Sequence, residues 1–279
     1  CRIPRRSDAM SAALAPAPAV PTAAQPVTQA RVIRSEWTKL RALRSTWSCA
    51  LISVILIVGV GALAAGGKPY RVSAANPAVT AVSTSLFGVL LAQLVLGVLG
   101  VLVFSGEYGT GMIRATLAVV PSRLPVLWAK LLVLAGLVLP VALLAALAEF
   151  FMATAIQAAR GGSAISLTDP GVLRTLVGAA LYLSVAAVVG LALGALLRKT
   201  AAGISVFAAL FLIAPVIVAQ LPHSVARIAP YLPSSAGGAL WGQPLAAHPL
   251  GPWAGFAVLC GYAVVLTGLA AWRLRRRDA

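Results

Sequence analysis

The chain of 279 residues is 60% hydrophobic and only 10% charged, and its mean hydropathy is +0.96. Ordinary soluble domains carry about 25% charged residues, and a soluble fold of this composition would expose much apolar surface to water. The composition therefore excludes a soluble globular protein and predicts an integral membrane protein. The net charge of +16 favours basic cytoplasmic loops over a nucleic-acid partner, because the basic residues lie in short flanks between apolar runs.

Residues 1–30 are predicted to form a flexible leader. The stretch is rich in Ala, Pro, Ser, Thr and Gln, and its prolines at 16, 18, 21 and 26 oppose helix formation. The chain begins with Cys, so we expect translation to start at Met10 and residues 1–9 to lie upstream of the true start.

Residues 31–45 are predicted to form an amphipathic helix that lies in the membrane interface. The segment carries five basic residues, and its apolar side chains cluster on one arc of a helical wheel. Glu36, Trp37 and Lys39 belong to this helix. Glu36 projects into the apolar arc, which leaves a solvated basic flank as the alternative.

Six apolar segments follow, within a predicted permease domain at residues 46–273. A basic cytoplasmic tail at 274–279 follows this domain. Each segment has the roughly 20 residues that a helix needs to cross about 30 Å of hydrocarbon. The expected spans are 47–66, 82–105, 125–152, 175–197, 201–221 and 252–272. The fold class is therefore an all-α membrane protein with six transmembrane helices.

The basic residues indicate the orientation of these spans. Alternate sides of the six segments receive 17 and 5 Lys or Arg residues, and the richer side holds both ends of the chain. The positive-inside rule therefore predicts that both termini are cytoplasmic. Because Arg outnumbers Lys by 18 to 4, as in GC-rich bacterial genomes, we expect a multi-pass protein of a bacterial cell membrane.

No pattern for catalysis or for a metal site is present in the sequence. The nearest approach to a phosphate loop, Gly61 to Pro69, has a misplaced first glycine and a proline where a hydroxyl should hold magnesium. The three cysteines and two histidines form no ligand set. We therefore expect no enzyme activity and no cofactor in this chain; if ATP drives it, a separate subunit must bind ATP and Mg²⁺.

Two polar residues inside the apolar segments are candidates for a transport pathway, Gln93 and Glu149. An intramembrane acid usually marks an ion or proton path. Glu149, however, lies 19 residues beyond Lys130, or roughly 28 Å along a helix, and this spacing favours a role in which the two charges anchor opposite ends of one span. The small-residue pairs Gly190-xxx-Gly194 and Gly251-xxx-Gly255 indicate close helix packing.

The segment at 106–123, between the second and third spans, is predicted to be a short amphipathic helix on the cytoplasmic side. Glu107, Thr110 and Arg114 share one face that a cytosolic partner could contact, and Pro121 ends the helix. An ordinary connecting loop is the alternative, and the pattern alone favours neither.

The run E-x-x-x-G-x-x-R-A-T-L-A-x-x-P-x-R in this segment, followed seven residues later by Lys130, resembles the coupling segment of type-2 ABC transporter permeases. The stretches SEWTKLRALRSTW at 35–47 and YLPSSAGGAL at 231–240 are also similar to actinobacterial members of that family. The resemblance implies a six-span exporter permease that pairs with ATP-binding subunits and with a second permease copy or paralogue in the lipid bilayer. It further implies a surface that transmits movement from the ATPase, made of Glu107, Gly109, Gly111, Arg114, Thr116, Pro121 and Arg123.

Two other functions remain as alternatives to an ABC exporter permease. One is a secondary transporter driven by an ion gradient, for which Gln93 and Glu149 would be the polar residues of the pathway. The other is a membrane anchor or assembly protein that transports nothing. The sequence does not indicate a substrate, since the residues that would line the spans are generic apolar ones.

Overall fold

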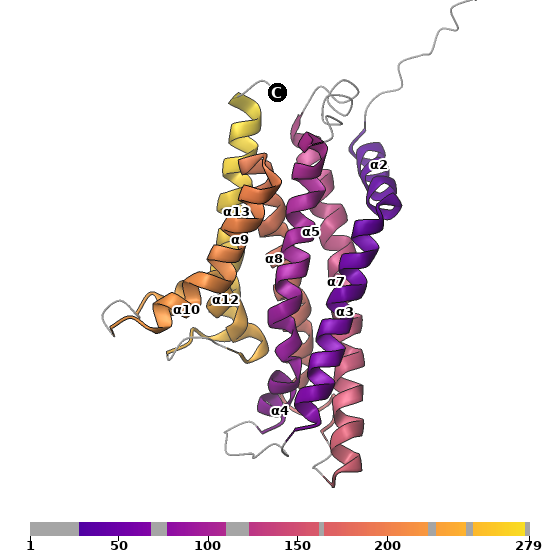
Figure 1. Ribbon diagram of the computed structural model, residues 1–279, viewed down its shortest axis with the longest axis vertical. Helices are drawn as coiled ribbons and strands as arrows, with labels where there is room; N and C mark the ends of the chain where they lie inside the picture. Colours follow the sequence, from indigo (N-terminus) through magenta and orange to yellow (C-terminus); the bar gives the residue numbers. More distant parts are fainter. Residues whose placement is uncertain are drawn as a thin grey trace, which may run out of the picture.

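The protein is a bundle of long helices with a short helix at each end, α2 (Gln29–Ala42) at one and α4 (Pro77–Ser85) at the other (Figure 1). The computed structural model describes residues 28–67, 77–109, 123–161, 165–222, 227–243 and 248–276, and these ranges contain no strand. Six helical segments are long and apolar enough to span a membrane: Arg44–Ala65, Pro77–Tyr108, Leu124–Ala159, Val172–Leu197, Thr200–Ala219 and Pro252–Arg276. The predicted all-α membrane fold with six long apolar helices is confirmed.

Successive spans run in opposite directions, so both ends of the described chain lie at the same end of the bundle (Figure 1). That end holds the short helix α2 (Gln29–Ala42), and we call it the α2 end. The other end, here the α4 end, holds α4 (Pro77–Ser85) and the last turns of the first and third spans. The arrangement agrees with an even number of crossings.

The first four spans form the larger part of the bundle. Their helices are α3 (Arg44–Ala65), α5 (Val89–Gly109), α7 (Arg123–Ala159) and α8 (Val172–Leu197), and a 3₁₀ turn, η2 (Leu86–Gly88), joins α4 to α5 within one span. Helices satisfy their backbone hydrogen bonds internally, as hydrocarbon requires. α7 stays a single helix through Pro140. α8 is the most deeply buried of the six spans.

Glycines let α5 and α8 approach until their backbones touch. A methyl group added at Gly190 would come within 2.2 Å of the carbonyl oxygen of Gly97, and one at Gly100 within 2.1 Å of that of Ala187. A methyl group added at Gly194 would likewise come within 2.7 Å of the carbonyl oxygen of Val101. The expected packing role of the Gly190-xxx-Gly194 pair is therefore confirmed, within one chain and between two of its spans.

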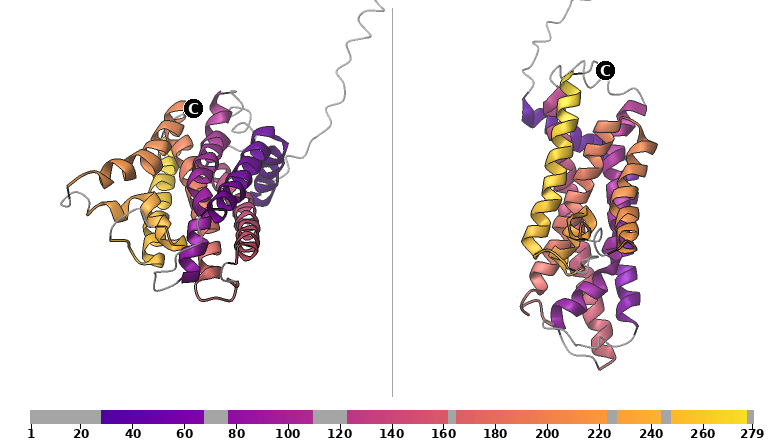
Figure 2. Two further views of the ribbon diagram at one scale, coloured as in Figure 1. Left: turned by 60° about the horizontal axis from the view of Figure 1, so that its bottom comes forward. Right: turned by 90° about the vertical axis from the view of Figure 1, so that its left-hand side faces the viewer.

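The fifth span is irregular. α9 (Thr200–Ala208) leads into a π-helical turn, η3 (Ala209–Ile213), and then into α10 (Ala214–Ala219), which leans away from the bundle (Figures 1 and 2). Pro215, in the first turn of α10, has no N–H to donate to the preceding turn. A wider turn just before a proline removes the clash that its ring would otherwise cause.

The chain then folds back against the bundle before the last span. Three short pieces, η4 (Ala229–Tyr231), α12 (Pro233–Gly238) and η5 (Ala239–Trp241), pack against α8 and α13 (Pro252–Arg276). All of α12 is buried. A methyl group at Gly255 would come within 2.2 Å of the carbonyl oxygen of Ala236, whereas Gly251 has nothing within 4 Å. Only the second glycine of that pair therefore packs closely.

The outer surface of the bundle is apolar. Large side chains point outward along the spans, among them Leu63, Leu144 and Val264, which are 78%, 66% and 72% exposed. Such exposure would be costly in water but is suited to contact with lipid tails. The exposed apolar surface and the long helices together describe a multi-pass membrane protein.

Candidate functional site

Four charged side chains meet inside the α2 end of the bundle. Glu36 and Lys39 come from α2, Glu107 from the last turn of α5, and Lys130 from the second turn of α7. Three of them are almost fully buried, with side-chain exposures of 5% for Glu36, 8% for Glu107 and 3% for Lys130. We call these four residues the ion-pair cluster.

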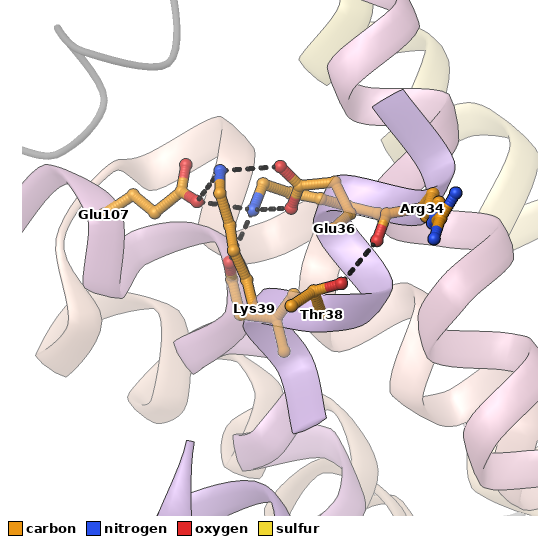
Figure 3. A network of polar contacts seen from close by, with 7 residues as sticks. Arg34, Glu36, Thr38, Lys39 and Glu107 are labelled. Carbon is orange, nitrogen blue, oxygen red and sulfur yellow. Dashed lines mark hydrogen bonds and ion pairs between the residues drawn. The ribbon is translucent and has the colours of Figure 1, made fainter. Parts of the chain in front are cut away.

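The cluster alternates carboxylates and ammonium groups. Nζ of Lys130 lies 2.6 Å from Oε2 of Glu36 and 2.8 Å from Oε1 of Glu107. Nζ of Lys39 lies 2.8 Å from Oε1 of Glu36 and 3.3 Å from Oε1 of Glu107 (Figure 3). Each ammonium group therefore contacts both carboxylates, and the formal charges within the cluster sum to zero.

Electrostatics explains why these charges are buried together. A buried charge is expensive unless it is paired and hydrogen-bonded, so each member depends on the others. Lys130 also donates to the carbonyl oxygen of Val103, at 3.4 Å. Burial lowers the pKa of Lys39, but its hydrogen bonds and charge attraction to Glu36 and Glu107 outweigh this, and the pKa is raised above its ordinary value.

The spacing of buried residues along α2 brings Glu36 to the side of the helix that faces the ion-pair cluster. Val32, Glu36 and Leu40 are spaced by four residues, so they form one buried stripe on the helix. Val32 packs against Val126 and Ala129 of α7, next to Lys130. Gln29 adds a hydrogen bond from Nε2 to the carbonyl oxygen of Pro125. α2 is thus held to α7 by apolar packing and by ion pairs.

Further contacts at the α2 end connect α5 to the turn between α8 and α9. The guanidinium of Arg198 lies 5.4 Å from the ring centroid of Tyr108, and the hydroxyls of Ser105 and Thr200 are 3.0 Å apart. Arg198 caps α8 in the left-handed region, with φ of 57°. The last turn of α5 therefore contacts three neighbours: α2, α7 and the α8–α9 turn.

The structure accounts for only part of the predicted transmission surface. Glu107 and Gly109 belong to α5, and Arg123 is the first residue of α7. Gly111, Arg114, Thr116 and Pro121 lie outside the described residues, as does most of the predicted coupling helix. The carboxylate of Glu107 is turned inward, toward Lys130 and Lys39, so it joins the segment to the bundle instead of facing outward.

The predicted residues of the interfacial helix fall on different faces of α2. Glu36 is buried and Lys39 is partly buried, both in the ion-pair cluster. Trp37 is exposed at 37%, with the guanidinium of Arg41 at 5.9 Å from its ring centroid. A helix exists at Gln29–Ala42, and its position in the membrane interface stays a prediction.

The two candidate pathway residues are both buried. The amide oxygen of Gln93 accepts a hydrogen bond from the hydroxyl of Tyr182, between α5 and α8. Glu149 has no exposed surface, so its side chain does not reach the surface of the protein to anchor it at the membrane interface. Neither of its oxygens has a hydrogen-bond partner among the described residues.

Sequence reasoning missed the pairing of Lys130 with the two glutamates. Lys130 is 94 residues from Glu36 and 23 from Glu107, so the contacts depend on tertiary packing. Two signals were present in the sequence: an acid on the apolar arc of α2, and a lysine at the start of an apolar span. A charge of each sign in apolar surroundings would have suggested a buried pair.

Six apolar spans of alternating direction, with charges concentrated at the α2 end, define a multi-pass α-helical membrane protein. Residues 32–219 match the family described as ABC-2 family transporter protein. Because the match covers most of the chain and reaches from α2 to the end of α10, the protein belongs to this family, whose members are membrane components of ABC transporters. No curated protein matches the chain closely enough to count as a relative.

Proposed function

We propose that this chain is the permease subunit of an ATP-driven ABC exporter in the bacterial cell membrane. In this proposal the α2 end faces the cytoplasm, separate subunits bind ATP and Mg²⁺, and the spans form the path of the substrate. A second permease copy or a paralogue completes the path. The family membership supports a permease subunit that works with ATP-binding subunits in general.

The ion-pair cluster is the observation that carries the coupling part of the proposal. The segment 110–122 connects α5 to α7 in the sequence, and the cluster ties these two helices to α2 through Glu107, Lys130 and Glu36. A force applied to this segment would therefore act on three helices at once. Packed elements with discrete arrangements are the physical means by which such a force is passed on.

The mechanism follows from this connection. ATP binding would draw two ATP-binding subunits together and shift the segment around 107–123. The ends of α5 and α7 and helix α2 would move with it as one unit, because separating them would expose buried charges. The spans would then tilt toward an outward-open state. This chain transmits the force and does not generate it.

The distribution of basic residues supports the orientation. Among the described residues, the α2 end carries the basic residues of α2, the Arg198–Lys199 turn and the arginines at the end of α13. The α4 end carries few, including Arg160 and Arg174. An excess of Lys and Arg on one side favours the cytoplasm for that side.

The test is ATP hydrolysis in lipid vesicles by the complex with the ATP-binding subunit from a neighbouring reading frame. Glu107→Gln and Arg114→Ala are each expected to lower transport-coupled hydrolysis by about tenfold or more, which corresponds to a loss of about 1.4 kcal/mol of coupling. Arg34→Gln, on the exposed face of α2, is the matched control and should leave hydrolysis unchanged.

Three results would contradict the proposal. Normal assembly and coupled hydrolysis in both variants would remove the coupling role of this segment. Substrate movement in vesicles that contain an ion gradient and no ATP would favour a secondary transporter. Purification of the intact protein with no ATP-binding subunit would favour a membrane anchor or assembly protein.

A further inference from the structure

Glu149 is a buried acid without a counter-charge, near the α4 end of α7. Its side chain has no exposed surface, and within the described ranges neither carboxyl oxygen has a hydrogen-bond partner. Elsewhere the same helix buries a charge only with opposite charges around it, at Lys130. An acid is costly in the interior of a membrane protein, and where one is present a functional role is the first expectation.

The surroundings of Glu149 are closely packed. A methyl group added at Gly61 of α3 would come within 2.5 Å of Cγ of Glu149, 2.7 Å of its Oε1 and 2.7 Å of the carbonyl oxygen of Ser85. The carboxyl therefore lies against the bare backbone of α3 and beside the end of α4. The Ser85 hydroxyl donates to the carbonyl oxygen of Val82, at 2.9 Å.

No cation in the described part of the chain faces this carboxyl. The described residues of α3 and α4 carry no basic group except Arg44, at the opposite end of α3. On α7 itself Lys130 is 19 residues away, or about 28 Å, and Arg160 is 11 residues away, with its guanidinium donating to the carbonyl oxygens of Gly66 and Gly67 at the end of α3. On α8, which packs against α7, the basic residue at this end is Arg174, and neither arginine forms an ion pair with Glu149 among the described residues. The remaining titratable group on α3, Cys49, is 12 residues from Gly61, or about 18 Å.

A proton suits this site better than a metal cation does. Sodium and calcium ions need several oxygen ligands, and six to eight is usual for calcium. The packing brings one carboxyl and one backbone carbonyl together, at Glu149 and Ser85. The ionised carboxylate would be left without a counter-charge among the described residues, and the one side-chain donor beside it there, the Ser85 hydroxyl, is bonded to Val82, so the neutral acid is the form that this environment accommodates.

A small pocket lies beside Ser85. It lies between α4 and α7 and is lined by Ser85, Thr154, Gln157 and Ile165 among others. Its volume of about 10 Å³ is close to the minimum for one water molecule. Gln157 donates to the carbonyl oxygen of Ala65, at the end of α3, at 2.8 Å. Ser85, which packs beside Glu149, and Gln157, which contacts the end of α3, therefore line the same pocket.

We propose that Glu149 is a proton-binding site within the membrane, which exchanges its proton with the α4 end through the space beside Ser85 and Gln157. This proposal does not rest on ATP-driven export. In the proposed orientation the exchange is with the extracytoplasmic side, and only that assignment rests on the proposed function.

The test uses dicyclohexylcarbodiimide, an apolar reagent that adds to neutral carboxylic acids. The acid oxygen bonds to the carbodiimide carbon, the proton moves to a nitrogen, and rearrangement leaves a stable N-acylurea with no leaving group. Peptide mass spectrometry of the full chain in lipid vesicles would give the labelled fraction of each glutamate. The reaction would be run from about pH 5 to about pH 9, which covers the range over which buried carboxyls titrate.

We expect Glu149 to be labelled at low pH, with a rate that falls by up to about tenfold for each pH unit once the acid begins to ionise. Glu36 and Glu107 are internal controls in the same molecule, and their ion pairs should keep them unlabelled. Glu149→Gln should remove the adduct. In sealed vesicles the rate should follow the pH on the α4 side.

Several results would overturn the proposal. If Glu149 forms no adduct at any pH, and the infrared spectrum of the folded protein also lacks a protonated-carboxyl band that Glu149→Gln removes, Glu149 does not bind a proton in this pH range. If labelling is independent of pH, the acid is permanently neutral and only structural. Labelling that follows the pH on the α2 side would contradict the exchange route. Normal labelling with no ATP hydrolysis would instead leave the proton site standing and count against the exporter.

Discussion

Helix α7 carries two buried ionisable residues that the fold treats in opposite ways. Lys130 lies among two carboxylates at the α2 end, and the second ammonium group, of Lys39, completes the ion-pair cluster. Glu149, about 28 Å further along, packs against the backbone of Gly61 and beside Ser85, with no opposite charge among the described residues. The first site keeps its charges by pairing them, and the second accommodates an acid in its neutral form.

The comparison teaches that burial alone does not reveal the role of a charged residue in a span. Pairing fixes the position of three helices relative to one another, since no member can leave without exposing the rest. An unpaired acid holds no neighbour in place, but it can gain and lose a proton. We therefore expect structural consequences from changes at Lys130 and mainly chemical ones from changes at Glu149.

The largest expected effect is on stability, from Lys130→Met. The substitution leaves two buried carboxylates with only Lys39 between them, and breaking a buried ion pair costs about 3–5 kcal/mol. The free energy of unfolding in mixed micelles would measure the loss. The double variant Lys130→Met/Glu107→Met keeps the Glu36–Lys39 pair and should recover most of it. A double variant as unstable as the single one would show that charge imbalance is not the cause.

A smaller effect is expected from Gly61→Ala, which adds a methyl group against Glu149 and Ser85. Overpacking of this kind costs about 1–3 kcal/mol, because a backbone carbonyl cannot move aside easily. Gly59→Ala is the matched control on the same helix, since nothing lies within 4 Å of the added methyl group. It should be neutral, or stabilising by up to about 1 kcal/mol. Equal stability of the two variants would contradict the close packing around Glu149.

The smallest expected effect is the pH dependence that Lys39 contributes. Its pKa is raised in the folded protein, so its stabilisation is fully present below about pH 10.5, the ordinary value, and is lost as the pH rises through the higher folded value. The difference in melting temperature between the wild type and Lys39→Met should therefore be constant near neutral pH and shrink in strong alkali. A difference in melting temperature that persists in strong alkali would show that the ion pairs of Lys39 are not its cause.

The sequence was sufficient for the membrane fold and for the helices that span it. Runs of Leu, Val and Ala longer than 20 residues rarely form any structure other than a membrane-spanning helix. The arc of apolar residues on 31–45 indicated a separate helix. The ends of the spans were less well predicted. α7, for example, runs to Ala159, because polar residues such as Gln157 find partners within the protein.

The contacts within the candidate site could not be predicted from the sequence. Glu36 was recognised as an acid on an apolar arc, yet its partner lies on another helix, and no local pattern connects them. Pro215 indicated in the sequence that the fifth span would be broken. The sequence did not show that the break would be a π-helical turn followed by the separate helix α10. Burial of Glu149 depends on Gly61 leaving room for it, which only the packing of α3 on α7 reveals.

The glycines between α5 and α8 restrict how this protein can move. Sliding one helix by a single residue along the other, about 1.5 Å, would bring larger side chains to places where only hydrogen atoms fit. The two helices must therefore keep their register throughout any working cycle and move together as one rigid body. Because the segment 110–122 directly follows α5 in the sequence, a force applied to that segment would act on both helices together.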